Sequence, residues 1–442
     1  MHSVRTCPRL FVQSTGPRPA KRRCLSSEGT RPHKILFFGA DRFSCVTLET
    51  LYAARQDLIQ HLVVVTPPDQ KTGRRLKDVH RPPLRILAES LSIPSIALPP
   101  PLLKEWIPPP EFLIPSQSRC EPSSLLLTAS YGHLLPTALL SRFEPLNTLN
   151  LHPSMLPSYR GAAPIQWGII NGDADANWNS THLDSPRGMG VSVQELSHGK
   201  FDRGRILAQE KIARAAGLFR LLCLAMVPPR SDFSTLEPFL ARAGSELVVK
   251  VLRDLPRYQA NARPQDPSRA TSAPKLTKAS ARINWNTTSA TEITRLQRGI
   301  GHQVSRKTPC LPLFAAFHRT TRALPNNNAS IPPLEAAAAT TQLQLVLGDS
   351  GPLRLLSGLS PRPDRPGLMF GFDKSVFVTA ARNSLDGTDR WADSAETPFD
   401  SQDKIEVIQV SKVKKEGGKW TEARDWWNGV KRHVTNGWLE LE

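Results

Sequence analysis

Short apolar runs and helical patterns alternate over the first half of the chain. Residues 34–38, KILFF, are an apolar run that meets Gly39, and residues 61–66 form a second run ahead of a loop rich in proline and basic residues. After Pro82 and Pro83, apolar residues recur at intervals of three and four, which predicts a helix with one buried face: Leu84, Leu87, Ala88 and Leu91.

Further strands are predicted at residues 124–128, 148–151 and 190–196, and another follows a turn within residues 199–212. Strands that alternate with helices at close intervals are typical of a parallel sheet, so we expect an α/β fold for this half. Ligands of such sheets bind beyond the carboxyl ends of the strands.

The second half of the chain has a different pattern. Residues 257–274 contain few large apolar side chains and many turn formers, which indicates a linker. SATE at residues 289–292 is a capping box, which predicts the start of a helix. The strands predicted beyond it have no helices between them: residues 343–347, 375–380 and 404–415.

This change of pattern predicts two domains. We expect an α/β domain at residues 33–256 and, after the linker, a smaller domain at residues 275–442. Several strands without intervening helices favour a small β-barrel, OB-like in kind, for the second domain.

Asn150 and His152 stand at the end of the strand predicted at residues 148–151. They are two residues apart, so their side chains share one face of the strand. An amide and an imidazole on one cavity can bind a carbonyl oxygen and stabilise the charge that develops when a nucleophile attacks it. Asp202, in the turn FDRG, is the natural carboxylate to orient the imidazole. The alternative is a structural His, an Asn that completes a turn, and an Asp that caps.

Charge and cysteine content narrow the class of protein. Lys and Arg number 57 against 39 Asp and Glu, a balance that favours a polyanionic partner or an organelle that imports basic chains. The six cysteines contain no CxxC pair, so neither a zinc site nor a disulfide framework is predicted, and a reducing compartment is expected. The most apolar run, residues 215–227, is too short to span a bilayer and contains Arg220.

The first 27 residues contain six Lys or Arg, four Ser and no Asp or Glu. This composition is typical of a mitochondrial transit peptide, which we expect at residues 1–32. The alternative is a basic tail without a targeting role. With the transit peptide, the expected location is the mitochondrial matrix.

The segment NLHPSMLPSYRGAAPIQWGIINGD, residues 150–173, resembles the signature of the 10-formyltetrahydrofolate-dependent formyltransferases. Other segments resemble this family in the same order: residues 35–51, 63–77, 125–140, 201–207, 273–285 and 405–429. The likeness is close over residues 33–215 and loose over residues 273–430. It implies a Rossmann-like formyltransferase domain, and within the family the match is nearest to the members that act on methionyl-tRNA.

The resemblance implies a role for each matching residue. Asn150, His152 and Asp202 would be the catalytic residues. The folate donor would lie along Ser154, Met155, Leu156 and Pro157 and along Tyr131, Gly132 and Leu134. The tRNA acceptor end would contact a basic loop that contains Lys71, Arg74, Arg75 and Lys77.

The expected partners are therefore 10-formyltetrahydrofolate as formyl donor and methionyl-initiator tRNA as acceptor, with no metal, no membrane and a monomeric enzyme. Two other hypotheses stay open. One is a formyltransferase for a small amine, although a small acceptor needs no basic loop. The other is an RNA-binding protein with a degenerate site, although Asn150, His152 and Asp202 are all present.

Overall fold

The computed structural model describes fourteen segments of the chain: residues 32–72, 77–175, 189–212, 231–281, 283, 287–301, 313–318, 340–352, 368–372, 375–381, 405–415, 419, 421–430 and 438–440. The residues of the expected transit peptide up to residue 31, and Arg74 and Arg75, lie outside them. Within the described residues, no helix is long and apolar enough to cross a membrane.

The first half of the chain forms a seven-stranded sheet in the order β5-β2-β1-β6-β7-β8-β9. Its strands are β1 (His33–Gly39), β2 (Ile59–Thr66), β5 (Ser95–Ala97), β6 (Ser124–Ala129), β7 (Thr148–His152), β8 (Gly190–Glu195) and β9 (Ile206–Lys211). The five strands from β5 to β7 pair in parallel, which confirms the predicted α/β class.

The last two strands, β8 and β9, pair antiparallel with their neighbours, which the alternation of strand and helix patterns did not predict. Only the short segment between Glu195 and Ile206 joins β8 to β9. A connection of that length reverses the chain, whereas a parallel pair needs a crossover of a dozen or more residues.

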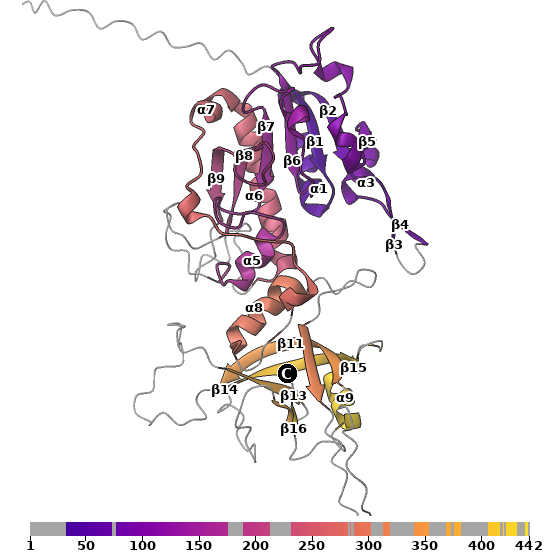
Figure 1. Ribbon diagram of the computed structural model, residues 1–442, viewed down its shortest axis with the longest axis vertical. Helices are drawn as coiled ribbons and strands as arrows, with labels where there is room; N and C mark the ends of the chain where they lie inside the picture. The colour runs from indigo at the N-terminus through magenta and orange to yellow at the C-terminus, as the bar shows by residue number, and fades with distance from the viewer. Residues whose placement is uncertain are drawn as a thin grey trace, which may run out of the picture.

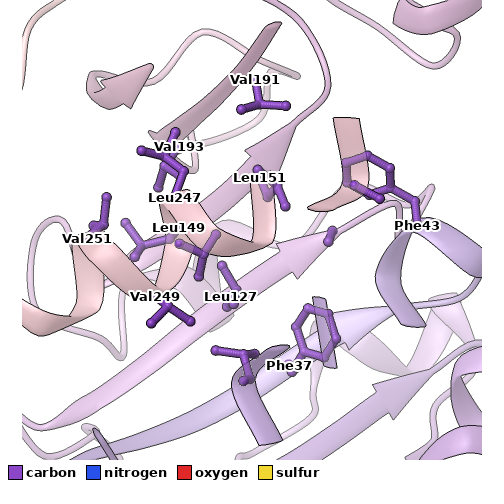
Figure 2. Packing of buried hydrophobic residues seen from close by; sticks show 14 of the residues in the cluster. Phe37, Phe43, Leu127, Leu149, Leu151, Val191, Val193, Leu247, Val249 and Val251 are labelled. Carbon is purple, nitrogen blue, oxygen red and sulfur yellow. The ribbon is translucent and has the colours of Figure 1, made fainter. Parts of the chain in front are cut away.

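The sheet has an apolar core on each face, and the larger of the two is shown in Figure 2. Alternate residues of each strand point into it. Phe37, Leu127, Leu149, Leu151 and Val193 lie there, all almost fully buried. They pack against helices α1 (Arg42–Ala53), α3 (Pro83–Ser90) and α6 (Phe233–Arg253). Since Leu149 and Leu151 point into this core, Asn150 and His152 point to the opposite face.

The opposite face is covered by shorter elements around a second core that includes Leu36, Phe38 and Phe112. The elements on this part of the chain are η2 (Pro100–Lys104), η3 (Pro110–Phe112) and α4 (Thr137–Leu140). Elsewhere in this half lie α2 (Arg55–Leu58), α5 (Pro164–Ile170), α7 (Leu255–Ala260) and a small hairpin of β3 (Gln70–Thr72) and β4 (Asp78–His80).

Residues 261–274, most of the expected linker, form a strap that is hydrogen-bonded to the α/β half. Arg263 pairs with Ile206 through two backbone hydrogen bonds of 2.7 and 2.9 Å, and Ala273 exchanges backbone hydrogen bonds with Arg160 and Ala163. A short turn, η5 (Pro267–Arg269), lies between the two attachments. The many turn-forming residues of this segment give it an irregular backbone. Hydrogen bonds to the α/β half nevertheless hold the strap in place.

Helix α8 (Ala290–Ile300) follows a turn η6 (Lys278–Ala281) and lies between the two sheets (Figure 1). Ser289 and Glu292 form the predicted capping box. The helix packs against α5, where its Arg295 and Arg298 both bond to Asp175.

The second sheet has the order β10-β11-β14-β13-β12-β16, with β15 paired to β14. It consists of β10 (Leu313–His318), β11 (Thr340–Pro352), β12 (Leu368–Phe372), β13 (Ser375–Ala381), β14 (Ile405–Lys415), β15 (Thr421–Glu422) and β16 (Trp438–Glu440), and α9 (Ala423–Val430) lies beside it. The pairings are antiparallel. Closure of this sheet into an OB-like barrel, and the domain boundaries, stay predictions.

Candidate active site

A pocket of about 460 Å³ lies at the carboxyl ends of β6 and β7. Its walls come from the segments that follow these two strands, from the loop after β8, and from the first turns of α1 and α6. Asn150, His152 and Asp202 all line it. The volume is in the range of small-molecule sites.

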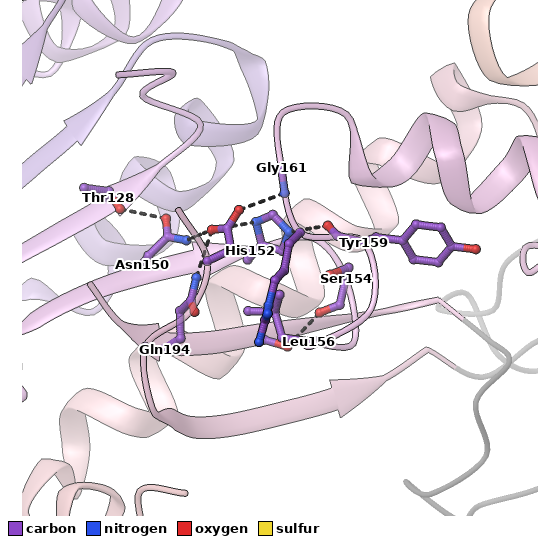
Figure 3. A network of polar contacts seen from close by, with 12 residues as sticks. Thr128, Asn150, His152, Ser154, Leu156, Tyr159, Gly161 and Gln194 are labelled. Atoms are coloured by element: carbon purple, nitrogen blue, oxygen red, sulfur yellow. Dashed lines mark hydrogen bonds and ion pairs between the residues drawn. The ribbon is translucent and has the colours of Figure 1, made fainter. Parts of the chain in front are cut away.

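The orientation of the Asn150 amide is set by its neighbour on β6. The Thr128 hydroxyl donates a 2.7 Å hydrogen bond to Asn150 Oδ1 (Figure 3). The amide nitrogen therefore faces the other way, where it donates to Asp202 Oδ1 at 3.3 Å. Asn150 has a second amide N–H, so it can also donate to a bound carbonyl oxygen.

His152 is buried, and both of its ring nitrogens have a partner. Nε2 lies 2.9 Å from the backbone carbonyl oxygen of Tyr159, so Nε2 carries a proton. Nδ1 lies 3.5 Å from Asp202 Oδ1. The Asp202 carboxylate therefore stands beside the second ring nitrogen and helps to orient the imidazole.

Asp202 accepts hydrogen bonds on both carboxylate oxygens. Gln194 Nε2 donates to Oδ1 at 2.9 Å, and the backbone N–H of Gly161 donates to Oδ2 at 2.9 Å. The residue has a φ of 54°, in the left-handed region that few residues adopt. Its carboxylate is thus fixed by three separate segments of the chain: β7, β8 and the loop after β7.

The position of Gly161 requires glycine. Its φ is +130°, and a Cβ added there would lie 2.5 Å from the backbone oxygen of Ala273 in the strap. The loop after β7 and the strap are therefore in close backbone contact beside the Asp202 carboxylate.

The far wall of the pocket is acidic as well as apolar. Asp41 and Glu237 line it together with Phe43 and Phe233. Burial, and next the negative charge of Asp41, raise the pKa of Glu237, while Arg42 opposes the shift. An acidic wall in a pocket favours a ligand with a positive or proton-donating group, such as an amine.

Comparison with known proteins decides the family. The family model described as "Formyl transferase" matches residues 33–216. A methionyl-tRNA formyltransferase from Syntrophus aciditrophicus is 33% identical over 285 residues, which cover 64% of this chain and 78% of that protein. The chain belongs to the formyltransferase family.

Mammalian relatives are similar at the same level. The mitochondrial methionyl-tRNA formyltransferase of Bos taurus is 32% identical over 281 residues, and the human one is 31% identical over 281 residues. These matches cover 63% of this chain but 59% of each mammalian protein, so the likeness spans about three fifths of their length. The structure of an N-formyltransferase from Helicobacter canadensis matches 86% of this chain and 99% of that chain at 13% identity, with a TM-score of 0.44.

The formyltransferase residues expected along the donor fall into two groups. Tyr131, Gly132 and Leu134 line the pocket, and Leu134 is 42% exposed at its wall. Within the described residues, the segment Ser154 to Pro157 does not line it. Ser154 and Leu156 are buried and bond to Ser158 and Ser192, so this segment supports the loop after β7. Donor contacts for both groups stay proposals.

Gln194 is a site residue that sequence reasoning missed. It is 1% exposed and lies directly opposite Asn150 in the antiparallel pair of β7 and β8. The signal was present: in GVSVQE the polar Ser192 and Gln194 alternate with Val191 and Val193, which places them on the face opposite the core. Only the antiparallel pairing of β8 with β7 shows that Gln194 lies beside Asn150.

The basic loop expected to contact tRNA belongs to the hairpin of β3 and β4, which extends beyond α3 (Figure 1). Lys71 and Lys77 are exposed on it. Within the described residues, no group of three His, Cys, Asp or Glu is arranged to bind a metal ion.

Proposed function

We propose that this protein transfers the formyl group of 10-formyltetrahydrofolate to the α-amino group of methionyl-initiator tRNA. The observation that carries the proposal is the set of three polar contacts on Asp202, which brings an amide, an imidazole and a carboxylate together in one pocket. The relatives named methionyl-tRNA formyltransferase support this acceptor.

The reaction needs no change of oxidation state. The lone pair of the α-amine forms a bond to the formyl carbon, the bond from that carbon to the folate nitrogen breaks, and the folate nitrogen takes up a proton as the amine loses one. Near neutral pH an α-amine is a fair nucleophile, since its pKa is about 7.7–8.0. The enzyme therefore has to orient the two reactants and stabilise a developing negative oxygen.

Each member of the site has a separate task in this proposal. The second amide N–H of Asn150 donates to the formyl oxygen, and the His152 imidazole lies beside it, oriented by Tyr159 and Asp202. The pair of His152 and Asp202 would pass the proton that the amine loses toward the folate nitrogen. Asp41 and Glu237 line the wall that would face the amine.

The donor fits the pocket by the chemistry of its lining. An apolar wall with a few oriented polar groups suits a flat heterocycle, and Tyr131, Gly132 and Leu134 supply part of that wall. Ser197 Oγ is buried at the pocket and has no hydrogen-bond partner among the described residues. A polar edge of the donor would satisfy it.

The tRNA acceptor and the mitochondrial location rest on charge. Lys71, Arg74, Arg75 and Lys77 would bind the phosphates of the acceptor end without reading sequence. The first 27 residues, which are basic and contain no Asp or Glu, would direct import into the matrix. The protein would act as a monomer.

The test is formylation of charged initiator tRNA by the full chain with 10-formyltetrahydrofolate as donor. Charged elongator methionyl-tRNA and a small amine, such as a nucleotide-linked amino sugar, serve as comparison acceptors. We expect fast transfer to the initiator tRNA alone. Faster transfer to the small amine would replace the acceptor in this proposal, and no transfer to any of the three would overturn it.

A further inference from the structure

The strap places one side chain, that of Gln265, against the turn that carries Asp202. Gln265 Nε2 lies 3.1 Å from the backbone oxygen of Asp202 and 2.8 Å from that of Gly204. Both carbonyls belong to the turn in which Asp202 has its φ of 54°. A left-handed residue other than glycine costs roughly 1–2 kcal/mol, and bonds to the flanking carbonyls favour that conformation over an extended one.

Gln265 also bonds to the residue that holds the Asp202 carboxylate. Its Nε2 lies 3.0 Å from Gln194 Oε1, and Gln194 Nε2 donates in turn to Asp202 Oδ1 at 2.9 Å. A primary amide has a donor end and an acceptor end. As long as Gln265 donates to its oxygen, Gln194 must present its NH2 group to Asp202.

The hydrogen bonds from Arg160 through Gln265 and Gln194 to Asp202 form a chain, which we call the relay. Arg160, at the start of the relay, decides which end of the Gln265 amide is the donor. Its Nε and Nη2 donate to Gln265 Oε1 at 3.1 and 2.7 Å. A guanidinium has donors only, so it selects the oxygen end of Gln265 and leaves the NH2 end, whose two N–H groups are shared among three acceptors: Gln194 Oε1 and the two turn carbonyls. Arg160 is itself fixed to the strap by two backbone hydrogen bonds, to Thr271 and Ala273.

We infer that Gln265 is a positioning residue for the transfer reaction, which acts through Gln194 to hold the Asp202 carboxylate toward His152 and Asn150. The kinetic test of this inference measures formyl transfer and therefore rests on the proposed function. Gln265 lies outside the α/β sheet, 71 positions from Gln194 in sequence, and touches neither His152 nor Asn150 in any bond of the relay.

The experiment compares three variants of the full chain: Gln265→Leu, Gln194→Leu and the double variant. Leucine is similar in size to glutamine and has no hydrogen-bonding group. We expect each single variant to lower kcat by about 10- to 100-fold with KM for both substrates nearly unchanged, because the carboxylate is misplaced by a fraction of an ångström.

The double variant tests whether the two residues act in series. Gln265 acts through Gln194 but also donates to the two turn carbonyls, so the reduction of kcat in the double variant should be clearly smaller than the product of the two single reductions. Reductions in kcat that multiply would overturn the inference, as would an unchanged kcat in Gln265→Leu.

A matched control is Gln259→Leu. Gln259, on α7, donates to Asn147 Oδ1 at 2.8 Å and to the Leu146 oxygen, so its replacement also removes partly buried amide bonds, but away from Asp202. The melting temperature of Gln259→Leu should fall, while its kcat should stay as in the wild type. An equal reduction of kcat in this control would reduce Gln265 to a structural role.

A second readout does not depend on the acceptor. In protein labelled with 15N-glutamine, hydrogen exchange of the Gln194 side-chain amide should become faster in Gln265→Leu and stay slow in Gln259→Leu. If the wild type forms no formylated tRNA, the proposed function is wrong. The exchange rate of the Gln194 amide still shows whether Gln265 holds Gln194 in place. Unchanged exchange in Gln265→Leu would overturn the relay even if the enzyme is active.

Discussion

Gly161 donates its backbone N–H to Asp202 Oδ2 at 2.9 Å, although the two residues are 41 positions apart. Two residues before Gly161, the carbonyl oxygen of Tyr159 accepts from His152 Nε2. One loop therefore orients both the carboxylate and the imidazole through backbone atoms. The catalytic geometry depends on the path of this loop as much as on the identity of the three polar side chains.

Replacement of the three polar residues is the direct test of their roles. We expect His152→Ala, Asn150→Ala and Asp202→Ala each to lower kcat by at least about 100-fold, because their contacts strengthen at the transition state. Folate binding, measured by fluorescence or calorimetry, should change little. Turnover near the wild-type level in any one variant would remove that residue from the catalytic role.

The close approach at Gly161 predicts a local disruption of structure on substitution. Gly161→Ala should be destabilised by about 2 kcal/mol more than Gly199→Ala, and kcat should fall with it. Gly199 also has a positive φ, +69°, but a Cβ there has nothing within 4 Å, so it isolates the cost of the backbone conformation. Equal destabilisation of the two variants in urea unfolding would mean that the approach to Ala273 is unimportant.

Much of the sheet and part of the site followed from local pattern. The alternation around Asn150 and His152 placed both on the polar face, and the capping box marked the first turn of α8. Two features could not follow. The antiparallel pairing of β8 with β7 is a tertiary contact that local pattern does not encode, and the contact of Gln265 with Gln194 joins an irregular strap to a strand. Such a contact has no periodic signature.

Asp175 predicts a pH-dependent contribution to stability. Burial alone would raise the pKa of this carboxyl, but the hydrogen bonds and charges of Arg298 and Arg295 outweigh burial and lower it. Because the folded-state pKa lies below the unfolded one, the stabilisation is complete above the unfolded pKa of about 3.9. It disappears as the pH falls through the folded-state value.

Asp175→Asn should therefore unfold about 3 kcal/mol more easily at pH 7, since two partly buried guanidinium groups lose their carboxylate. The difference from the wild type should shrink below pH 4, as seen in thermal melts across the range. Glu246→Gln is the control, because its pair with Arg242 is exposed and should contribute less than about 1 kcal/mol. A constant difference at every pH would contradict the ionic origin.

The basic hairpin predicts a salt-dependent weakening of tRNA binding. Arg74→Ala with Arg75→Ala should weaken binding of charged tRNA and reduce the slope of log K against log salt by roughly one unit for each phosphate that the loop no longer neutralises. Folate binding and slow transfer to a small amine should hardly change, because neither involves a phosphate chain. Arg242→Ala with Lys250→Ala, at two exposed positions of α6, serves as a charge-matched control. Equal reductions for both acceptors would place the loop in the active site instead.

The N-terminal composition predicts import. A fusion of residues 1–32 to a fluorescent reporter should enter mitochondria, because its first 27 residues are basic and contain no Asp or Glu, which suits import driven by the membrane potential. A variant with the six Lys and Arg of residues 1–27 replaced by Gln should stay outside. A wild-type fusion that remains in the cytosol would contradict the targeting role.

The strap changes where this enzyme can be divided. A chain cut after α7 would keep all seven strands of the first sheet, yet it would lack Gln265, Thr271 and Ala273, which hold Arg160 and the turn of Asp202. The hydrogen bonds that tie the strap to the first sheet therefore extend to Pro274, whose carbonyl accepts from the Trp167 indole. An exchange of second domains between relatives would have to retain this strap with the first sheet.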